Sequence, residues 1–170
     1  LDNLRTDAWL GELNVQSGHL GQTFAQFSAD RIRPRMNDAG LKFSPDGTQV
    51  LWTVVPNRVF IRSTPGEKQL SVTAQMKEAR RVEWGHDGRS LLIAGTGADG
   101  REGLYRVDPA SGAATFLTAG LGLNTFISSR DGKTIYYRTP QGKLAARSLD
   151  SGTERVLYER FDRVPNLSLS

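Results

Sequence analysis

Residues 43–52 read FSPDGTQVLW, which places a tight turn between two short apolar runs. The Asp46-Gly47 pair explains the turn, because Asp caps it locally and Gly accepts a positive φ without a Cβ clash. The same pair recurs as Asp87-Gly88 and Asp131-Gly132, at spacings of 41 and 44 residues (87 − 46 and 131 − 87). A period near 40 residues predicts repeated supersecondary units rather than one mixed fold.

The first strand expected in each repeat ends just before the turn. It carries apolar residues five and three positions ahead of the Asp, except that the third repeat has Ser128 at the second of these positions. Residues two apart share one face of a strand, so these positions predict side chains that wedge between neighbouring sheets. The predicted wedge residues are Leu41, Phe43, Val82, Trp84 and Phe126.

Three further strands follow each turn. They are expected at 50–55, 58–62 and 68–73 in the first repeat, at 91–94, 104–107 and 114–118 in the second, and at 134–138, 143–149 and 154–158 in the third. Four short antiparallel strands in about 40 residues are typical of one blade of a β-propeller. The predicted fold class is therefore all-β, a β-propeller of four-stranded antiparallel blades.

The repeats assign the whole chain, residues 1–170, to one propeller domain or fragment of a propeller. We expect blades at 39–74, 75–119 and 120–160. Residues 1–27 match the second half of a preceding blade, 28–38 a linker or insertion, and 161–170 the first strand of a following blade. About three complete blades with partial flanking blades favour part of a larger ring. The alternative is a closed four-bladed ring whose last blade lacks one strand, since single rings use about 4–8 blades.

Composition excludes several classes of site and partner. The sequence has no cysteine, which excludes disulfides and thiolate chemistry. The net charge is +4 and the arginines are spread along the chain, unlike the concentrated basic face of a nucleic-acid-binding protein. No run approaches the roughly 20 apolar residues that a membrane-spanning helix needs. We expect a protein or peptide as partner, with no nucleic acid and no membrane insertion.

No set of residues amounts to a catalytic or metal site. His19 and His86 fall in separate turns, so neither a metal nor another cofactor is expected. Asp46, Asp87 and Asp131 occupy equivalent places in separate blades, which predicts turn capping rather than an acidic triad. No Gly-x-Ser-x-Gly elbow presents a serine nucleophile. We therefore expect that the chain is not an enzyme.

The candidate binding residues are polar positions at the starts of the innermost strands. They lie six or seven residues ahead of the turn Asp and are Arg80, Arg81, Asn124 and, in the C-terminal segment, Asn166. Loops from every blade converge at the mouth of a propeller channel. These residues are therefore predicted to contact an anionic ligand or a peptide carboxylate there. The plainer alternative is that they are solvated strand ends.

Two stretches carry a family resemblance. Residues 43–47 (FSPDG) with 50–52 (VLW), and residues 149–157 (LDSGTERVL), resemble the repeat of TolB-type β-propellers. In that repeat the first strand runs into a Ser-Pro-Asp-Gly turn and the third ends in an Asp-x-x-Gly turn. The resemblance covers about Ala8 to Ser170, although only the first repeat has the full Ser-Pro-Asp-Gly turn. It implies a non-catalytic binding, scaffold or sensor module of a bacterial protein, and favours a periplasmic or other extracytoplasmic location that the residues alone do not decide.

A second family shares this repeat. Prolyl-oligopeptidase relatives use a similar propeller to screen substrates for a separate hydrolase domain. The alternative function is therefore the substrate-gating portion of such a hydrolase, with the catalytic domain outside this chain. An incomplete ring also predicts self-association, because its open blade edges present unpaired strands.

Overall fold

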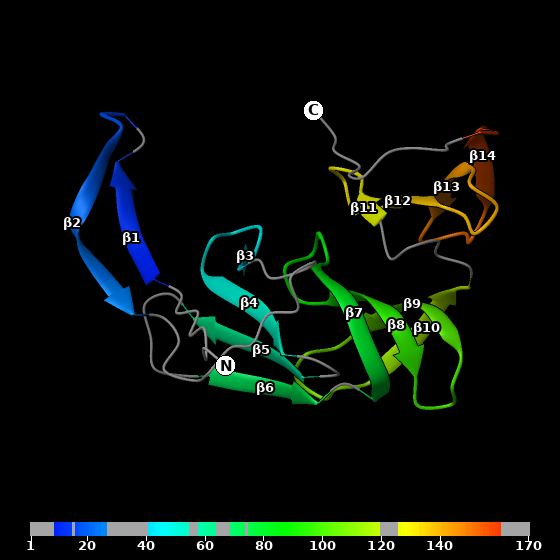
Figure 1. Cartoon of the computed structure of the whole chain (residues 1–170), viewed down its shortest axis with the longest axis horizontal. Helices are drawn as coiled ribbons and strands as arrows, with labels where there is room; N and C mark the ends of the chain where they lie inside the picture. The colour runs from blue at the N-terminus through cyan, green and yellow to red at the C-terminus, as the bar shows by residue number, and fades with distance from the viewer. Residues whose placement is uncertain are drawn as a thin grey trace, which may run out of the picture.

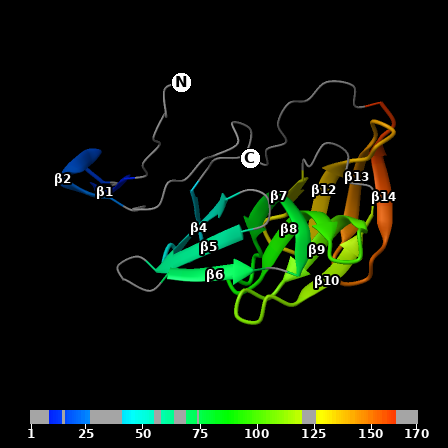
Figure 2. The ribbon, with the colours of Figure 1, turned by 60° about the horizontal axis from the view of Figure 1, so that its bottom comes forward.

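The computed structural model describes residues 9–14, 16–26, 41–54, 58–63, 69–73, 75–119 and 126–160. All regular elements within these ranges are β-strands, arranged as three four-stranded antiparallel sheets and one two-stranded hairpin. The sheets follow one another along an arc in the order of the sequence (Figure 1, Figure 2). The all-β propeller fold predicted from the repeat is thus confirmed. Over the described ranges the sheets do not close, so the four-bladed closed ring is not observed.

Each sheet is a simple meander whose spatial order is its sequence order. The hairpin consists of β1 (Trp9–Asn14) and β2 (His19–Gln26). The first blade consists of β3 (Lys42–Phe43), β4 (Gln49–Val54), β5 (Arg58–Ser63) and β6 (Gln69–Thr73). The second consists of β7 (Met76–Trp84), β8 (Leu91–Gly97), β9 (Glu102–Val107) and β10 (Ala114–Thr118). The third consists of β11 (Phe126–Ser128), β12 (Thr134–Arg138), β13 (Leu144–Ser148) and β14 (Glu154–Tyr158).

The Asp-Gly turns repeat in atomic detail. Gly47, Gly88 and Gly132 have φ values of 71°, 63° and 68°, in the left-handed region that a Cβ disfavours. Each donates its N–H to the carbonyl three residues earlier, at 2.8, 3.0 and 2.9 Å respectively. The local chemistry of two residues therefore joins the first and second strands of every blade in the same way.

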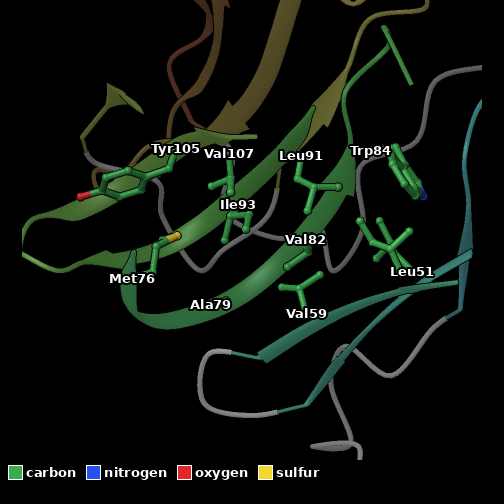
Figure 3. Close-up of a cluster of buried hydrophobic side chains, with 11 residues drawn as sticks. Leu51, Val59, Met76, Ala79, Val82, Trp84, Leu91, Ile93, Tyr105 and Val107 are labelled. Carbon is green, nitrogen blue, oxygen red and sulfur yellow. The ribbon is translucent and has the colours of Figure 1, made fainter. Parts of the chain in front are cut away.

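Two apolar clusters hold the three blades together. Between the first and second blades, Leu51, Val59 and Ile61 meet a larger set from the second blade (Figure 3), namely Met76, Ala79, Val82, Trp84, Leu91, Ile93, Tyr105 and Val107. Between the second and third blades, Leu92, Ala94 and Leu104 meet Phe126, Ile135, Tyr137 and Ala145. β8 contributes alternate residues to both clusters, so its apolar run is buried on both faces.

The wedge prediction is confirmed for Val82, Trp84 and Phe126, which are all buried, while Leu41 is half-buried. It is wrong for Phe43, which is 53% exposed. Trp84 packs on the face of the first blade that carries Leu51. Phe43 holds the equivalent place one blade earlier, and the element described before it is the two-stranded hairpin rather than a four-stranded blade. Among the described residues, no four-stranded blade therefore faces this aromatic side chain.

β7 is longer than the sequence predicts. It begins at Met76 rather than near Val82, and its pairing with β8 shifts twice, between Met76 and Glu78 and between Ala79 and Arg81. Each β-bulge inserts one residue and breaks the alternation of apolar and polar positions. The period of two that marks a strand is hidden as a result.

Candidate functional site

The second bulge of β7 brings two consecutive arginines to the same face of the sheet. Arg80 is the inserted residue between Ala79 and Arg81. Its Nη2 donates to Thr96 Oγ1 at 3.2 Å, while the Arg81 guanidinium lies over the ring of Phe126 in the third blade, 5.6 Å from the centroid. In a regular strand neighbouring side chains point to opposite faces. Because of the bulge, Arg80 bonds within the second blade while the adjacent Arg81 reaches the third.

Arg80 belongs to an ion network within the second blade. Its Nε is 3.1 Å from Glu78 Oε2, and its Nη1 pairs with Glu102 Oε1. Burial lowers the pKa of Arg80, but the hydrogen bonds and charges of Glu102 and then Glu78 outweigh it, so the pKa lies above its ordinary value. The guanidinium is therefore charged and already paired. Such partly exposed pairs contribute at most about 1 kcal/mol each.

Arg81 belongs to a second network that joins three blades. Glu83 Oε1 lies 3.0 Å from both Nε and Nη2 of Arg81, and it accepts a hydrogen bond from Lys42 Nζ at 2.6 Å. Lys42 comes from β3, Arg81 and Glu83 from β7, and Phe126 from β11. We call these four residues the inner-strand cluster, because β3, β7 and β11 are the first strands of their blades.

The backbone around this cluster is fixed by the neighbouring wedge residue. Trp84 Nε1 donates to the Lys42 carbonyl at 3.0 Å, which ties β7 to β3. Lys42 Nζ in turn donates to the Val82 carbonyl at 2.9 Å. Phe126 is fully buried, and the Arg81 guanidinium lies over its ring in a cation–π contact. The side chains of the cluster are therefore held by contacts from more than one blade.

The four predicted binding residues have different outcomes. Arg80 and Arg81 lie in the middle of β7 and pair with carboxylates, so their expected place at the start of the strand is wrong, and their contact with an anionic ligand stays a prediction. Asn124 and Asn166 lie outside the described residues, and their role stays a prediction.

Sequence reasoning missed Lys42, Glu83 and Phe126 as parts of the site. Glu83 could have been found, because it lies two residues from Arg81 and therefore shares its face of the strand. The signal for Lys42 is the repeat itself, because Lys42 and Glu83 both lie four residues ahead of their turn Asp, and packing of the two blades brings them together.

The turn aspartates cap their turns, as predicted. Asp46 accepts hydrogen bonds from Ser44 Oγ at 2.6 Å and from the Thr48 N–H at 3.0 Å, which lower its pKa. The pKa of Asp131 is lowered in the same way by Ser129 and Lys133. The carboxylates of Asp46 and Asp131 are therefore ionised, and they already accept hydrogen bonds within their own turns.

For Asp87 burial is the largest single influence, and it acts to raise the pKa. The backbone N–H groups of Ser90 and Arg89 outweigh that effect, and the net pKa is lowered. Among the residues with described positions, no group of three His, Asp or Glu side chains could hold a metal ion, and none forms a helix with the length and apolarity to cross a bilayer.

Comparisons with known proteins find similarity in structure only. No family model matches the chain, and no curated protein matches its sequence. TolB from Acinetobacter baumannii is similar with a TM-score of 0.61 at 20% identity, over 86% of this chain and 36% of that one. An oligogalacturonate lyase in complex with manganese is similar with a TM-score of 0.67 at 16% identity, over 88% and 41%. An auxiliary nutrient-binding protein from Bacteroides thetaiotaomicron is similar with a TM-score of 0.57 at 18% identity, over 72% and 30%.

At these identities the similarity concerns the fold. The matched part spans 30 to 41% of the length of the three structures, so this chain corresponds to well under half of each. The resemblance that the Asp-Gly repeat carries is confirmed at that level: the chain has the fold of TolB-type β-propellers.

Proposed function

We propose that the chain is a non-catalytic binding module that recognises an acidic group of a protein or peptide partner. One observation carries this proposal: Lys42 of β3 and Arg81 of β7 come together around Glu83, and the Arg81 guanidinium lies over Phe126 of β11. A bacterial, extracytoplasmic setting is part of the proposal and rests on the similarity to TolB.

The chemistry of these residues suits recognition. An arginine fork and an ammonium group bind carboxylates through charge-assisted hydrogen bonds, which are roughly twice as strong as neutral ones. General acid–base chemistry instead needs a group whose pKa lies near the working pH. The turn aspartates Asp46, Asp87 and Asp131 have lowered pKa values and are hydrogen-bonded within their own turns. They are unsuited to act as bases.

Peptide arrays test the binding function. We expect wild-type protein to retain acidic peptides over neutral and basic ones. Arg81→Ala should weaken that binding about tenfold, because a hydrogen bond to a charged group contributes about 1.5–3 kcal/mol. Arg106→Ala is the matched control, since Arg106 is an exposed arginine on β9 of the same blade. No preference for acidic peptides, or equal losses in the two variants, would contradict the proposal.

Activity assays test the non-catalytic part. We expect no turnover of peptide or glycoside substrate panels by purified protein above a heat-inactivated sample. Turnover that co-purifies with the folded chain would show an enzyme instead. Binding of uncharged oligopeptides in preference to acidic ones would favour the alternative, a propeller that screens substrates for a hydrolase.

A further inference from the structure

A single carboxylate oxygen of this chain fills the space between two cations of the inner-strand cluster. Glu83 Oε1 lies 2.6 Å from Lys42 Nζ and 3.0 Å from each of two nitrogens of Arg81. Three charge-assisted contacts on one oxygen are what these cations would offer to a carboxylate from any source. Glu83 therefore occupies the position of an acidic ligand group.

The two cations keep other contacts that do not depend on Glu83. Lys42 Nζ also donates a hydrogen bond to the Val82 carbonyl, and the Lys42 carbonyl accepts one from Trp84 Nε1. Arg81 rests on the Phe126 ring. If the Glu83 side chain rotates away, Lys42 and Arg81 retain their positions. The site is thus largely formed before a ligand arrives.

The site can be reached from solvent without separating the blades. The side chains of Lys42, Arg81 and Glu83 are 27%, 22% and 25% exposed, whereas Phe126, which contacts Arg81, is fully buried. A partly exposed carboxylate can leave for water at modest cost, since it regains hydration there. Because Lys42 and Arg81 are mostly shielded from water, they favour a new carboxylate partner over hydration.

We propose that Lys42 and Arg81 form a binding site for an acidic side chain of a protein or peptide, and that Glu83 occupies this site in the free chain. This inference rests on the proposed binding function and adds that Glu83 competes with the ligand for the site. An incoming carboxylate displaces Glu83, and the apparent affinity is reduced by the fraction of molecules in which Glu83 is bound. Removing the Glu83 charge should therefore strengthen binding.

The test uses a capped hexaglutamate peptide titrated into wild-type protein and two variants. Glu83→Gln should bind the peptide at least about tenfold more tightly than wild type, because the competing carboxylate is gone. Glu102→Gln is the matched control, since it removes the same charge beside Arg80 on the same blade but outside the cluster. It should change the affinity less than about twofold.

The Trp84 indole N–H gives a local reading by NMR, because its hydrogen bond to Lys42 reports on the site. Its resonance should shift during the titration of Glu83→Gln and stay in place with capped hexaglutamine. Adding Arg81→Gln to Glu83→Gln should abolish the gain in affinity. Glu83→Asp, which shortens the carboxylate and keeps its charge, should give a smaller gain and serves if Glu83→Gln does not fold.

The outcomes separate this inference from the proposed function. If wild-type protein binds acidic peptides through Arg81 but Glu83→Gln binds no more tightly, the displacement is wrong and the binding function stands. Equal gains in Glu83→Gln and Glu102→Gln indicate long-range charge and also overturn the site. If neither wild-type protein nor any variant binds hexaglutamate, both proposals fail.

Discussion

In the first two blades, the residue just before the turn Asp lies close to the turn glycine of the next blade. Pro45 Cδ lies 3.8 Å from where a Cβ at Gly88 of the next blade would be. His86, the equivalent residue of the second blade, approaches Gly132 so closely that a Cβ there would overlap its own Cβ. His86 is an exposed turn residue, as the sequence predicts, and it also packs on the third blade. Glycine is thus favoured at position 132 both by the positive φ and by the close approach of His86.

A pair of alanine substitutions separates these two roles. Gly47 has a φ of 71° and no atom within 4 Å of its missing Cβ, so Gly47→Ala should cost only the backbone strain, about 1–2 kcal/mol. Gly132→Ala has nearly the same φ and should cost about 1–3 kcal/mol more, because its Cβ overlaps His86. Denaturant unfolding measures both.

The coupling to His86 supplies the control. Adding His86→Gly to Gly132→Ala should recover most of the additional loss, whereas adding it to Gly47→Ala should recover nothing. Equal costs for the two alanine variants would contradict the close contact between the blades.

The turn aspartates predict how stability depends on pH. The pKa values of Asp46, Asp87, Asp108 and Asp131 are lowered in the fold from the ordinary 3.8. The unfolded chain therefore takes up protons first as the pH falls. The stabilisation is complete well above pH 3.8 and is lost as the pH drops through that value to the lower folded pKa.

Melting temperatures recorded from about pH 5 down to about pH 2 test this dependence. Wild-type stability should fall across that range. The double variant Asp46→Asn/Asp131→Asn should fall less steeply, because Asn retains an acceptor oxygen but cannot titrate. Identical slopes for the two proteins would show that the turn carboxylates do not contribute.

At the scale of single strands, burial depends on what the neighbouring blade supplies. Trp84 and Phe43 occupy the same position of the repeat, yet Trp84 is 8% exposed and Phe43 is 53% exposed. Trp84 enters the apolar cluster shared with the first blade and donates a hydrogen bond to Lys42. An identical local pattern therefore gives two different contributions to stability.

Substituting both aromatics measures that difference. Trp84→Ala should destabilise the chain by about 3–5 kcal/mol, the usual cost of a buried aromatic. Phe43→Ala should cost less than about 1 kcal/mol, because half of its side chain is already in water. Trp84→Phe should lie between them, near about 1 kcal/mol for the lost hydrogen bond. Similar costs at positions 43 and 84 would contradict the packing described here.

The strands also show how far sequence reasoning reaches. The Asp-Gly turns and β10 and β12 were predictable, because turn chemistry and alternation are local signals. The length of β7 was not, since its bulges after Met76 and Ala79 break the period. The candidate site divides in the same way: Arg81 was predicted from its place in the repeat, whereas Lys42 was missed, because its contact with Glu83 also depends on tertiary packing.

At the scale of the whole molecule, the third blade is the last one among the described residues, and its outer strand is exposed. All five residues of β14 are exposed, including Val156, Leu157 and Tyr158 at 40%, 39% and 60%. The equivalent strand of the second blade, β10, is mostly half-buried, and Leu117 packs against the cluster shared with the third blade. In Figure 1 and Figure 2, β14 lies at the outer limit of the arc. An apolar edge strand of this kind favours pairing with another chain.

We therefore expect the purified chain to self-associate at high concentration. Leu157→Lys should weaken that association about tenfold, because a charge at an edge strand opposes pairing and the lost apolar burial is on the order of 1.5 kcal/mol. Thr115→Lys adds the same charge at an exposed position of β10 and should have little effect. Sedimentation over a concentration series measures both, and a strictly monomeric wild-type chain would contradict the expectation.

Pro45 approaches the turn glycine of the next blade loosely, whereas His86 approaches Gly132 closely. Because Pro45 and His86 hold equivalent places in the repeat, we expect the bulk of the residue before each Asp to influence the angle between consecutive blades. A compact proline and a broad imidazole at this position should therefore give different angles between blades. We therefore expect one side chain per repeat to contribute to the number of blades that a ring of such repeats accommodates.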